Sequence, residues 1–416
     1  MRVISCLAGC LLLGSVAQAA DLATMQKMAV DNRAVVQRYM TQVEQSEKDV
    51  IIARGGYYPS VDISYVATAL NESTLFEDSR NSVAGGRVSW NLFAGFRDKY
   101  ALASAEQAKE VETYRLQGVR QDIQLNVALG YLFVYDRQAN LKVAGDAFKT
   151  LEQLYRDGEN RYNVGLIGKN ELLKFRVDYD NADITVKAAQ ATLDTSVNTL
   201  GREVGADISF GDLDFAEFAA LPGELDEKEY LGKMLATRSE IKALEGLIEV
   251  SDSQVKVASS DYYPRVDLIG SYSRYDDSFL NGAGDGGEDE VRGQLQLSMN
   301  LFRGYATEAN TSRARLEKLA LQYDLRELQD ALANQLKNLF IDYRVSLANV
   351  EVARRSIEQA VENLRITRLK YDEGLQRESD LLDAITNLSR AQANEVAVVR
   401  TVFLNYFQII RMVDGF

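Results

Sequence analysis

Histidine is absent from the 416 residues of this chain, and proline occurs only three times. Histidine is the most frequent general base and metal ligand in proteins, so its absence excludes most hydrolytic triads and zinc sites. The formal charge of −14 argues against a nucleic-acid partner, because phosphate binding needs clustered Lys and Arg. Carboxylates are frequent, but none is accompanied by a base or nucleophile in a catalytic spacing. The sequence therefore predicts neither an enzyme nor a protein with a cofactor.

Cysteine is confined to Cys6 and Cys10, at the N-terminal end of the chain. This region has a basic residue, Arg2, then an apolar run, then a small-residue motif that ends at Ala19, as is typical of a secretory signal peptide. We expect residues 1–19 to be removed on export. An alternative is a lipoprotein box in which Cys10 is lipidated. The predicted mature chain contains no cysteine, which excludes disulfides and thiolate metal sites.

Three short motifs occur twice, in the same order, and this self-similarity predicts an internal duplication. The pairs are Tyr57-Tyr58-Pro59 with Tyr262-Tyr263-Pro264, Asn91-Leu92-Phe93-Ala94-Gly95 with Asn300-Leu301-Phe302-Arg303-Gly304, and Tyr162-Asn163-Val164-Gly165 with Tyr371-Asp372-Glu373-Gly374. We predict a first structural repeat at 20–204, a connecting segment at 205–227 and a second structural repeat at 228–416.

Helical periodicity dominates both predicted repeats. Apolar residues spaced by three, four or seven predict one helix from Ala23 to about Arg54. Two much longer segments, 97–161 and 307–370, contain no proline and little glycine. As helices, each would be on the order of 100 Å long. A helix of similar character follows each turn glycine, so we expect long antiparallel helical hairpins.

Four stretches alternate apolar and polar residues and are predicted to be strands: 61–69, 84–92, 266–272 and 291–301. Three of them contain nine to eleven residues, which suffices for a tilted strand to cross a bilayer, and 266–272 is shorter. A half-buried strand of a soluble sheet is the alternative for any one stretch. The acidic, glycine-rich segment 274–291 is expected to be a solvated loop. Four strands cannot form a closed barrel in lipid, so closure would have to come from oligomerisation.

With its duplicated Tyr-Pro before a strand, Asn-Leu-Phe-x-Gly after a strand pair and Tyr-x-x-Gly turn, the chain resembles the TolC-like outer-membrane factor family. The resemblance covers nearly all of the predicted mature chain. It implies a mainly α fold with a membrane β-barrel portion. The helical hairpins would form an α-barrel tunnel, and four strands per chain would contribute to a trimeric twelve-stranded β-barrel.

The resemblance also implies a function and partners. The function is a passive outer-membrane exit duct of a tripartite efflux pump or a type I secretion system, energised by an inner-membrane transporter of the ABC, RND or MFS type. A periplasmic adaptor protein, outer-membrane lipid and two further copies of the chain are the other implied partners. The implied location is the outer membrane, with an extension into the periplasm. A structural periplasmic coiled-coil or tether protein without transport is the alternative, and the exported substrate is not identifiable from the sequence.

Two carboxylates are expected at the end of the implied tunnel. Asp380 and Asp383 are three residues apart, so they lie on the same helix face. On their own they would be interpreted as solvated surface charges. In the light of the resemblance, they match an inward-facing acidic pair that forms the channel constriction.

Other residues near the two turn glycines, Gly165 and Gly374, are implied to control opening of the tunnel. Tyr371 and Glu171 match a tyrosine and an acid that help to hold neighbouring hairpins closed in the family, and Lys174 lies in the same turn as Glu171. Some family members have an arginine where this chain has Gln376, and Arg377 follows it. Pro59 and Pro264 are expected to mark the entry into the strands.

Overall fold

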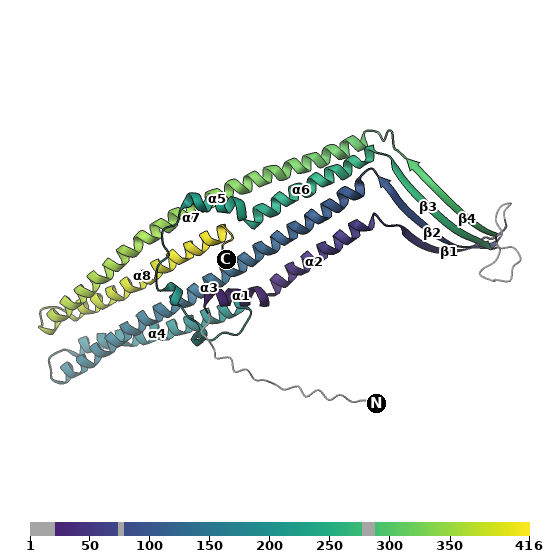
Figure 1. The fold of residues 1–416 in the computed structure, drawn as a ribbon. Helices are drawn as coiled ribbons and strands as arrows, with labels where there is room; N and C mark the ends of the chain where they lie inside the picture. The colour runs from purple at the N-terminus through teal and green to yellow at the C-terminus, as the bar shows by residue number, and fades with distance from the viewer. Residues whose placement is uncertain (1–20, 74–78, 277–287) are drawn as a thin grey trace, which may run out of the picture. The chain divides into compact units, whose positions relative to one another are not determined.

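The computed structural model describes residues 21–73, 79–276 and 288–416. The predicted signal peptide, 1–19, and most of the predicted acidic loop lie outside these residues. The helices are α1 (Leu22–Asn32), α2 (Ala34–Gly55), α3 (Arg97–Asn163), α4 (Lys169–Val204), α5 (Glu227–Thr237), α6 (Ser239–Ser259), α7 (Ala306–Asp372) and α8 (Glu378–Met412) (Figure 1). The strands are β1 (Ser60–Ala69), β2 (Arg80–Ala94), β3 (Arg265–Asp276) and β4 (Glu288–Ser298).

The contacts of the chain divide it into two compact units. The first, which we call the hairpin unit, consists of the chain up to Val36, Val119–Ala236 and Leu332–Phe416. The second, which we call the sheet unit, consists of Gln37–Gly118 and Thr237–Ala331. Each unit therefore contains residues from both predicted repeats, and α3 and α7 contribute to both units.

The two long helices predicted from the sequence are confirmed, since α3 and α7 each contain 67 residues. The duplicated Gly-aromatic pair before each helix has a backbone explanation. Gly95, Phe96, Gly304 and Tyr305 all have positive φ, between 57° and 68°. A Cβ at Gly95 would lie 2.5 Å from the carbonyl oxygen of Ser260, so only glycine fits there. Among the described helices, none has the length and apolar character required to span a membrane.

The single helix expected from Ala23 to about Arg54 is wrong, because the chain breaks between α1 and α2. Arg33 has an extended backbone, with φ −72° and ψ 122°. Its side chain lies at the end of α4, where Nη1 is 2.6 Å from the carbonyl oxygen of Arg202 and Nη2 is 3.5 Å from Glu203. Arginine is a good helix former, so nothing local in the sequence indicates this break. The break is instead accompanied by the contact between the Arg33 side chain and the end of α4.

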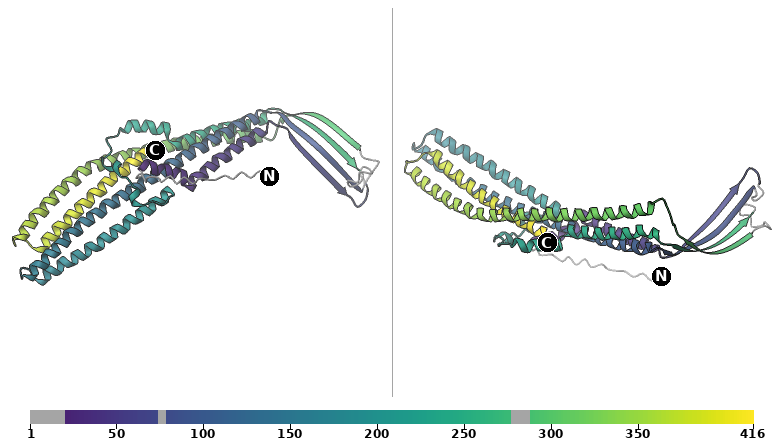
Figure 2. Two further views of the ribbon diagram at one scale, coloured as in Figure 1. Left: turned by 60° about the horizontal axis from the view of Figure 1, so that its bottom comes forward. Right: turned by 90° about the horizontal axis from the view of Figure 1, so that it is seen from above.

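The four strands of the sheet unit form one antiparallel sheet in the order β1-β2-β3-β4 (Figure 2). The predicted end of the first strand at residue 69 is confirmed, but the other three strands were predicted too short at their loop ends. Pairing reaches Arg80 on β2, Tyr275 on β3 and Glu288 on β4. Part of the segment expected to be a solvated loop is therefore strand. At the other end, β4 stops at Ser298, three residues before the predicted end.

The sheet has one apolar and one polar face, as the alternation predicts. Apolar side chains on the first face are strongly exposed, including Ile63 at 89% and Val291 at 83%. On the opposite face the register places Asp62 beside Arg87, Arg87 beside Ser271 and Ser271 beside Arg292. A polar row with charged residues on β1, β2 and β4 thus crosses the four strands. The sheet buries neither face within the described chain, which is unusual for a soluble antiparallel sheet.

The predicted connecting segment packs through aromatic residues of the hairpin unit. It contains two short 3-10 helices, Phe210–Asp212 and Ala216–Phe218. The rings of Phe215 and Phe218 lie 4.9 Å from Tyr131 and Tyr135 respectively, both on α3. The Tyr131 hydroxyl donates a hydrogen bond to the carbonyl oxygen of Asp214 in the same segment. Aromatic packing, with few regular backbone bonds, therefore holds this segment.

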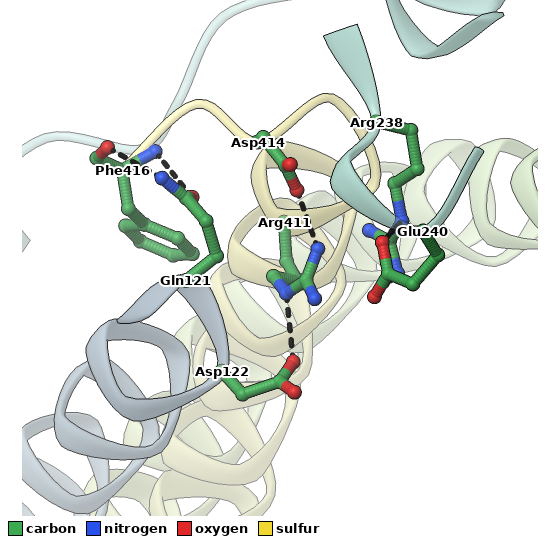
Figure 3. A network of polar contacts seen from close by, with 7 residues as sticks. All are labelled: Gln121, Asp122, Arg238, Glu240, Arg411, Asp414 and Phe416. Carbon is green, nitrogen blue, oxygen red and sulfur yellow. Dashed lines mark hydrogen bonds and ion pairs between the residues drawn. The ribbon is translucent and has the colours of Figure 1, made fainter. Parts of the chain in front are cut away.

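A polar network fixes the end of α8 in the hairpin unit (Figure 3). The buried Arg411 donates from Nε to Asp122 at 2.8 Å and from Nη1 to Asp414 at 2.5 Å. The Gln121 side chain donates to the carbonyl oxygen of Phe416 at 3.0 Å and accepts from its N–H at 3.1 Å. A buried guanidinium needs such partners, since burying an unpaired charge is costly. The network therefore joins α3 to the residues after α8.

Glu217 of the connecting segment gives the hairpin unit a pH-dependent stability. Burial raises the pKa of this carboxyl from an ordinary value of 4.5 to about 7, although it accepts a hydrogen bond from the N–H of Leu22; Asp21 and Asp214 add to the increase. The folded protein therefore binds this proton more tightly than the unfolded chain does. Stability is highest while the carboxyl is protonated and declines as the pH rises from about 4.5 through about 7.

Replacing Glu217 with Gln should remove this decline. We expect the variant to have a thermal unfolding midpoint a few degrees above that of the native protein at pH 8, with the gain shrinking towards pH 5. Circular dichroism across this pH range measures it. Glu224→Gln is the matched control, because it removes one negative charge from the same segment. Parallel pH profiles for the native protein and Glu217→Gln would contradict the prediction.

Candidate functional site

The two helical hairpins of the hairpin unit end in equivalent turns. Gly165 follows α3 with φ +77°, and Gly374 follows α7 with φ +75°. In the first turn the N–H of Leu166 bonds to the carbonyl oxygen of Arg161 at 2.9 Å, and in the second the N–H of Leu375 bonds to that of Lys370 at 2.8 Å. These are Schellman C-caps, in which a left-handed glycine lets the chain satisfy the last helix carbonyls. The repeated Tyr-x-x-Gly motif thus builds the same hairpin end twice.

Tyr371 joins the two hairpins. Its hydroxyl, at the end of α7, donates a hydrogen bond to Glu171 Oε1, in the first turn of α4, at 2.8 Å. Burial and the bond to Glu171 both raise the pKa of the Tyr371 hydroxyl, which therefore remains a protonated donor. The structure brings together the pair that the resemblance singled out, and it does so within one chain.

A small apolar cluster supports this hydrogen bond. The Tyr371 ring is buried and meets the Phe175 ring edge to face, with 6.3 Å between centroids. Leu154, Leu381 and Ile385 complete the buried cluster, so α3, α4, α7 and α8 all contribute to it. Burial removes competing water, which makes the hydrogen bond between Tyr371 and the Glu171 carboxylate stronger than an exposed one.

Charged pairs lie around the cluster and also join the two hairpins. Arg161 Nη2 is 2.6 Å from Asp372 Oδ1, and Lys174 forms an ion pair with Glu378. The hydrogen bond from Lys174 lowers the pKa of the Glu378 carboxyl, which stays charged. Arg368 and Asp157 form a weaker pair at 3.9 Å. These pairs are partly exposed, so each alone contributes little to stability.

The structure places the two predicted constriction carboxylates differently. Asp380 is half-buried, and its Oδ2 accepts hydrogen bonds from the Gln376 side chain at 3.1 Å and from the N–H of Arg377 at 3.4 Å. It therefore caps the first turn of α8, where the helix dipole favours an acid. Asp383 is exposed. Gln376 and Arg377 thus lie against Asp380, while Lys174 bonds to Glu378.

Asp383 lines a groove of about 970 Å³ bordered by α3, α4 and α8. Leu173, Val177 and Leu382 supply much of its apolar surface, and Lys174 lies on its border. No group of acids suited to a metal ion is found in the described part of the chain. The groove therefore offers an apolar surface with charged residues among its lining.

Sequence reasoning overlooked some members of this site. Arg161, Asp372 and Glu378 all form links between the hairpins, as shown above. The available signal was their nearness to the duplicated turn motif, since each lies within four residues of a turn glycine. The two predicted strand-entry prolines lie far from this site in sequence, where Pro59 precedes β1 and Pro264 precedes β3 directly.

Known proteins resemble the chain along most of its length. The Protein CyaE of Bordetella pertussis is 24% identical over 90% of this chain and 80% of its own. The Outer membrane protein TolC of Vibrio cholerae is 21% identical over 92% of this chain and 88% of its own. The crystal structure of the outer membrane protein VceC from Vibrio cholerae superposes with a TM-score of 0.80 at 17% identity, covering 95% of this chain and 96% of that one.

The superposition confirms the predicted fold class, a mainly helical protein with four antiparallel strands that matches channel-tunnel structures. The relatives are channel proteins, which confirms that the chain is not an enzyme. A family model described as Outer membrane efflux protein matches residues 26–206 and 230–406, one stretch in each half of the chain. The chain therefore belongs to the outer membrane efflux protein family, the TolC homologues.

Proposed function

We propose that the protein is a passive exit duct of the outer membrane that opens and closes at its hairpin ends. The observation that supports this most directly is the exposed apolar face of the sheet. Val61, Ile63, Val291, Leu295 and Leu297 are each at least 68% exposed on that face. Leaving so much apolar surface in water is unfavourable, whereas contact with lipid is not.

The edges of the same sheet support a trimer. Within the described chain β1 pairs with β2 alone and β4 with β3 alone, so one side of each outer strand is left for another partner. In lipid, every unpaired backbone group costs several kcal/mol, so an open sheet is not stable there. Three copies would join β1 of one chain to β4 of the next and close a barrel of twelve strands, an even number as in bacterial barrels.

The hairpin ends support a gate. Tyr371, Glu171 and the charged pairs around them hold the two hairpins of one chain together through a few separate polar contacts. Interactions of this size can be broken by a partner that binds the separated hairpins better. In our proposal that partner complex is a periplasmic adaptor with an inner-membrane transporter of the ABC, RND or MFS type. The transporter supplies the energy and selects the exported substrate.

The first prediction of the proposed function tests the duct itself. Cell fractionation should recover the protein in the outer membrane after removal of residues 1–19, and light scattering in detergent should show a trimer. The purified trimer should form discrete channels in a planar bilayer, because a closed barrel leaves a continuous aqueous path. Protein heated until the trimer dissociates is the control and should be silent. A trimer that never conducts, or a protein recovered in the soluble periplasm, would favour the structural tether instead.

The second prediction concerns Asp380 and Asp383. In a trimer, three copies of each carboxylate would surround the axis, and rings of carboxylates favour cations. Changing both to Asn should therefore lower the preference for cations and weaken block by multivalent cations. Reversal potentials in a salt gradient measure the first effect. Trimer stability should change little, since loss of an exposed charge and part of a helix cap costs about 1 kcal/mol. Unchanged selectivity and block would leave Asp380 as a helix cap and Asp383 as a solvated surface charge.

The third prediction concerns Tyr371. Replacing it with Phe keeps the ring in its cluster but removes the hydrogen bond to Glu171, which is worth about 1.5–3 kcal/mol when the acceptor is charged. The closed state should lose this stabilisation, so the open probability in single-channel recordings should rise by about tenfold or more. Tyr162→Phe is the matched control, because Tyr162 holds the equivalent position before Gly165 but is 39% exposed. Equal effects of the two substitutions would refute a specific role for the Tyr371 hydroxyl.

A further inference from the structure

We propose that Arg161 is a positioning residue of the gate, which holds the Tyr371 ring so that its hydroxyl meets Glu171. The inference rests on the proposed function, in which separation of the hairpin ends opens the duct. It assigns to α3 a direct part in that step. Loss of Arg161 should then open the duct although the hydroxyl and its acceptor are both retained.

The geometry places one guanidinium against two consecutive residues of the other hairpin. Arg161 Cζ lies 5.1 Å from the centroid of the Tyr371 ring, and Arg161 Nη2 lies 2.6 Å from Asp372 Oδ1. A planar guanidinium can stack on an aromatic ring and bind a carboxylate at the same time, which an ammonium group cannot do equally well. Arg161 therefore restrains both the ring and the end of α7 that carries it.

The Tyr371 ring is held from several directions. Phe175 of α4 meets it edge to face, Arg161 of α3 lies over its face, and its hydroxyl bonds to Glu171. A hydrogen bond depends steeply on distance and angle, so rotation of the ring away from its position would weaken the bond to Glu171. Removing the guanidinium leaves space beside one face of the Tyr371 ring, so the ring can rotate away from Glu171.

Exposure indicates which contact of Arg161 matters more. The side chains of Arg161 and Asp372 are 31% and 49% exposed, so water screens their ion pair. The Tyr371 ring is only 7% exposed, and a cation beside a buried ring interacts more strongly than one at the surface. Arg161 should therefore act chiefly through Tyr371, with Asp372 as a secondary partner that orients the guanidinium.

Two other cations that link the hairpins differ from Arg161 in this respect. Lys174 bonds to Glu378, and Arg368 pairs with Asp157, so both add charged links between the hairpins. The described contacts of these two cations are with carboxylates, whereas Arg161 also covers an aromatic face. The position is favourable for a cation in any case, since Arg161 lies in the last turn of α3, where the helix dipole attracts positive charge.

The test measures the open probability of purified trimers in planar bilayers for a series of substitutions. Arg161→Gln should raise the open probability about fivefold, the size expected for loss of a partly buried cation–π contact. Arg161→Lys should give an intermediate increase, because it keeps the charge but not the planar group. Asp372→Asn should have the smallest effect. Arg156→Gln is the matched control, because its ion pair, 2.6 Å from Glu152, lies within α3 and joins no hairpins.

A second measurement separates positioning from a general loss of stability. If Arg161 acts by aiming the Tyr371 hydroxyl, Arg161→Gln should add little to the effect of Tyr371→Phe, in which that hydroxyl is already absent. A double-mutant cycle in the same recordings gives the coupling. Additive effects of the two substitutions, or an Arg161→Lys variant that gates like the native protein, would overturn the proposal.

Hydrogen exchange keeps the inference apart from the proposed function. In detergent, Arg161→Gln should increase amide exchange in the two turns, 163–168 and 373–377, and Arg156→Gln should not. If the native trimer forms no channels, the duct proposal fails, and exchange still decides whether Arg161 holds the hairpin ends. If the native trimer conducts but neither gating nor exchange responds to Arg161→Gln, the inference alone fails.

Discussion

Pairing of the strand edges is the constraint on which the rest of the structure depends. A single chain supplies a sheet with two outer edges and an apolar face, and its described residues neither pair the edges nor cover the face. Lipid tolerates the apolar face but not the edges, so closure needs further copies. In the proposed trimer, cyclic symmetry would arrange the helices that continue from the strands around the same axis. A ring of the long helices α3 and α7 would then follow from hydrogen bonds formed between the sheets of neighbouring chains.

The sequence carried most of this architecture because its patterns are long or duplicated. Helices of 67 residues leave a periodic signal that local exceptions do not obscure, and two copies of Tyr-x-x-Gly mark equivalent turns. The features that could not be predicted from the sequence depend on tertiary contacts. The break at Arg33 accompanies a hydrogen bond to the end of α4, and the strand extension at Glu288 depends on pairing with Tyr275 of the neighbouring strand β3. Local propensity gave no sign of either.

The site shows the same division. Asp380 and Asp383 were paired by spacing, yet the fold gives them different surroundings: one caps α8 and the other borders a groove. The Tyr371–Glu171 contact followed from likeness to a family, whereas the place of Arg161 beside that tyrosine needs the three-dimensional structure. A basic residue at a helix end is common, and sequence alone does not say whether it faces water or an aromatic ring.

The row of side chains across the polar face of the sheet has a consequence for how solutes move. Asp62 faces Arg87 on the neighbouring strand, and Arg292 bonds to Glu290 on its own strand at 2.9 Å. The electrostatic potentials of neighbouring opposite charges cancel beyond a short distance. This row therefore produces little net potential that could hold an ion or molecule near the polar face. If this face lined a closed barrel, it would bind ions of either sign only weakly. Solutes would then pass along it without being held at one position.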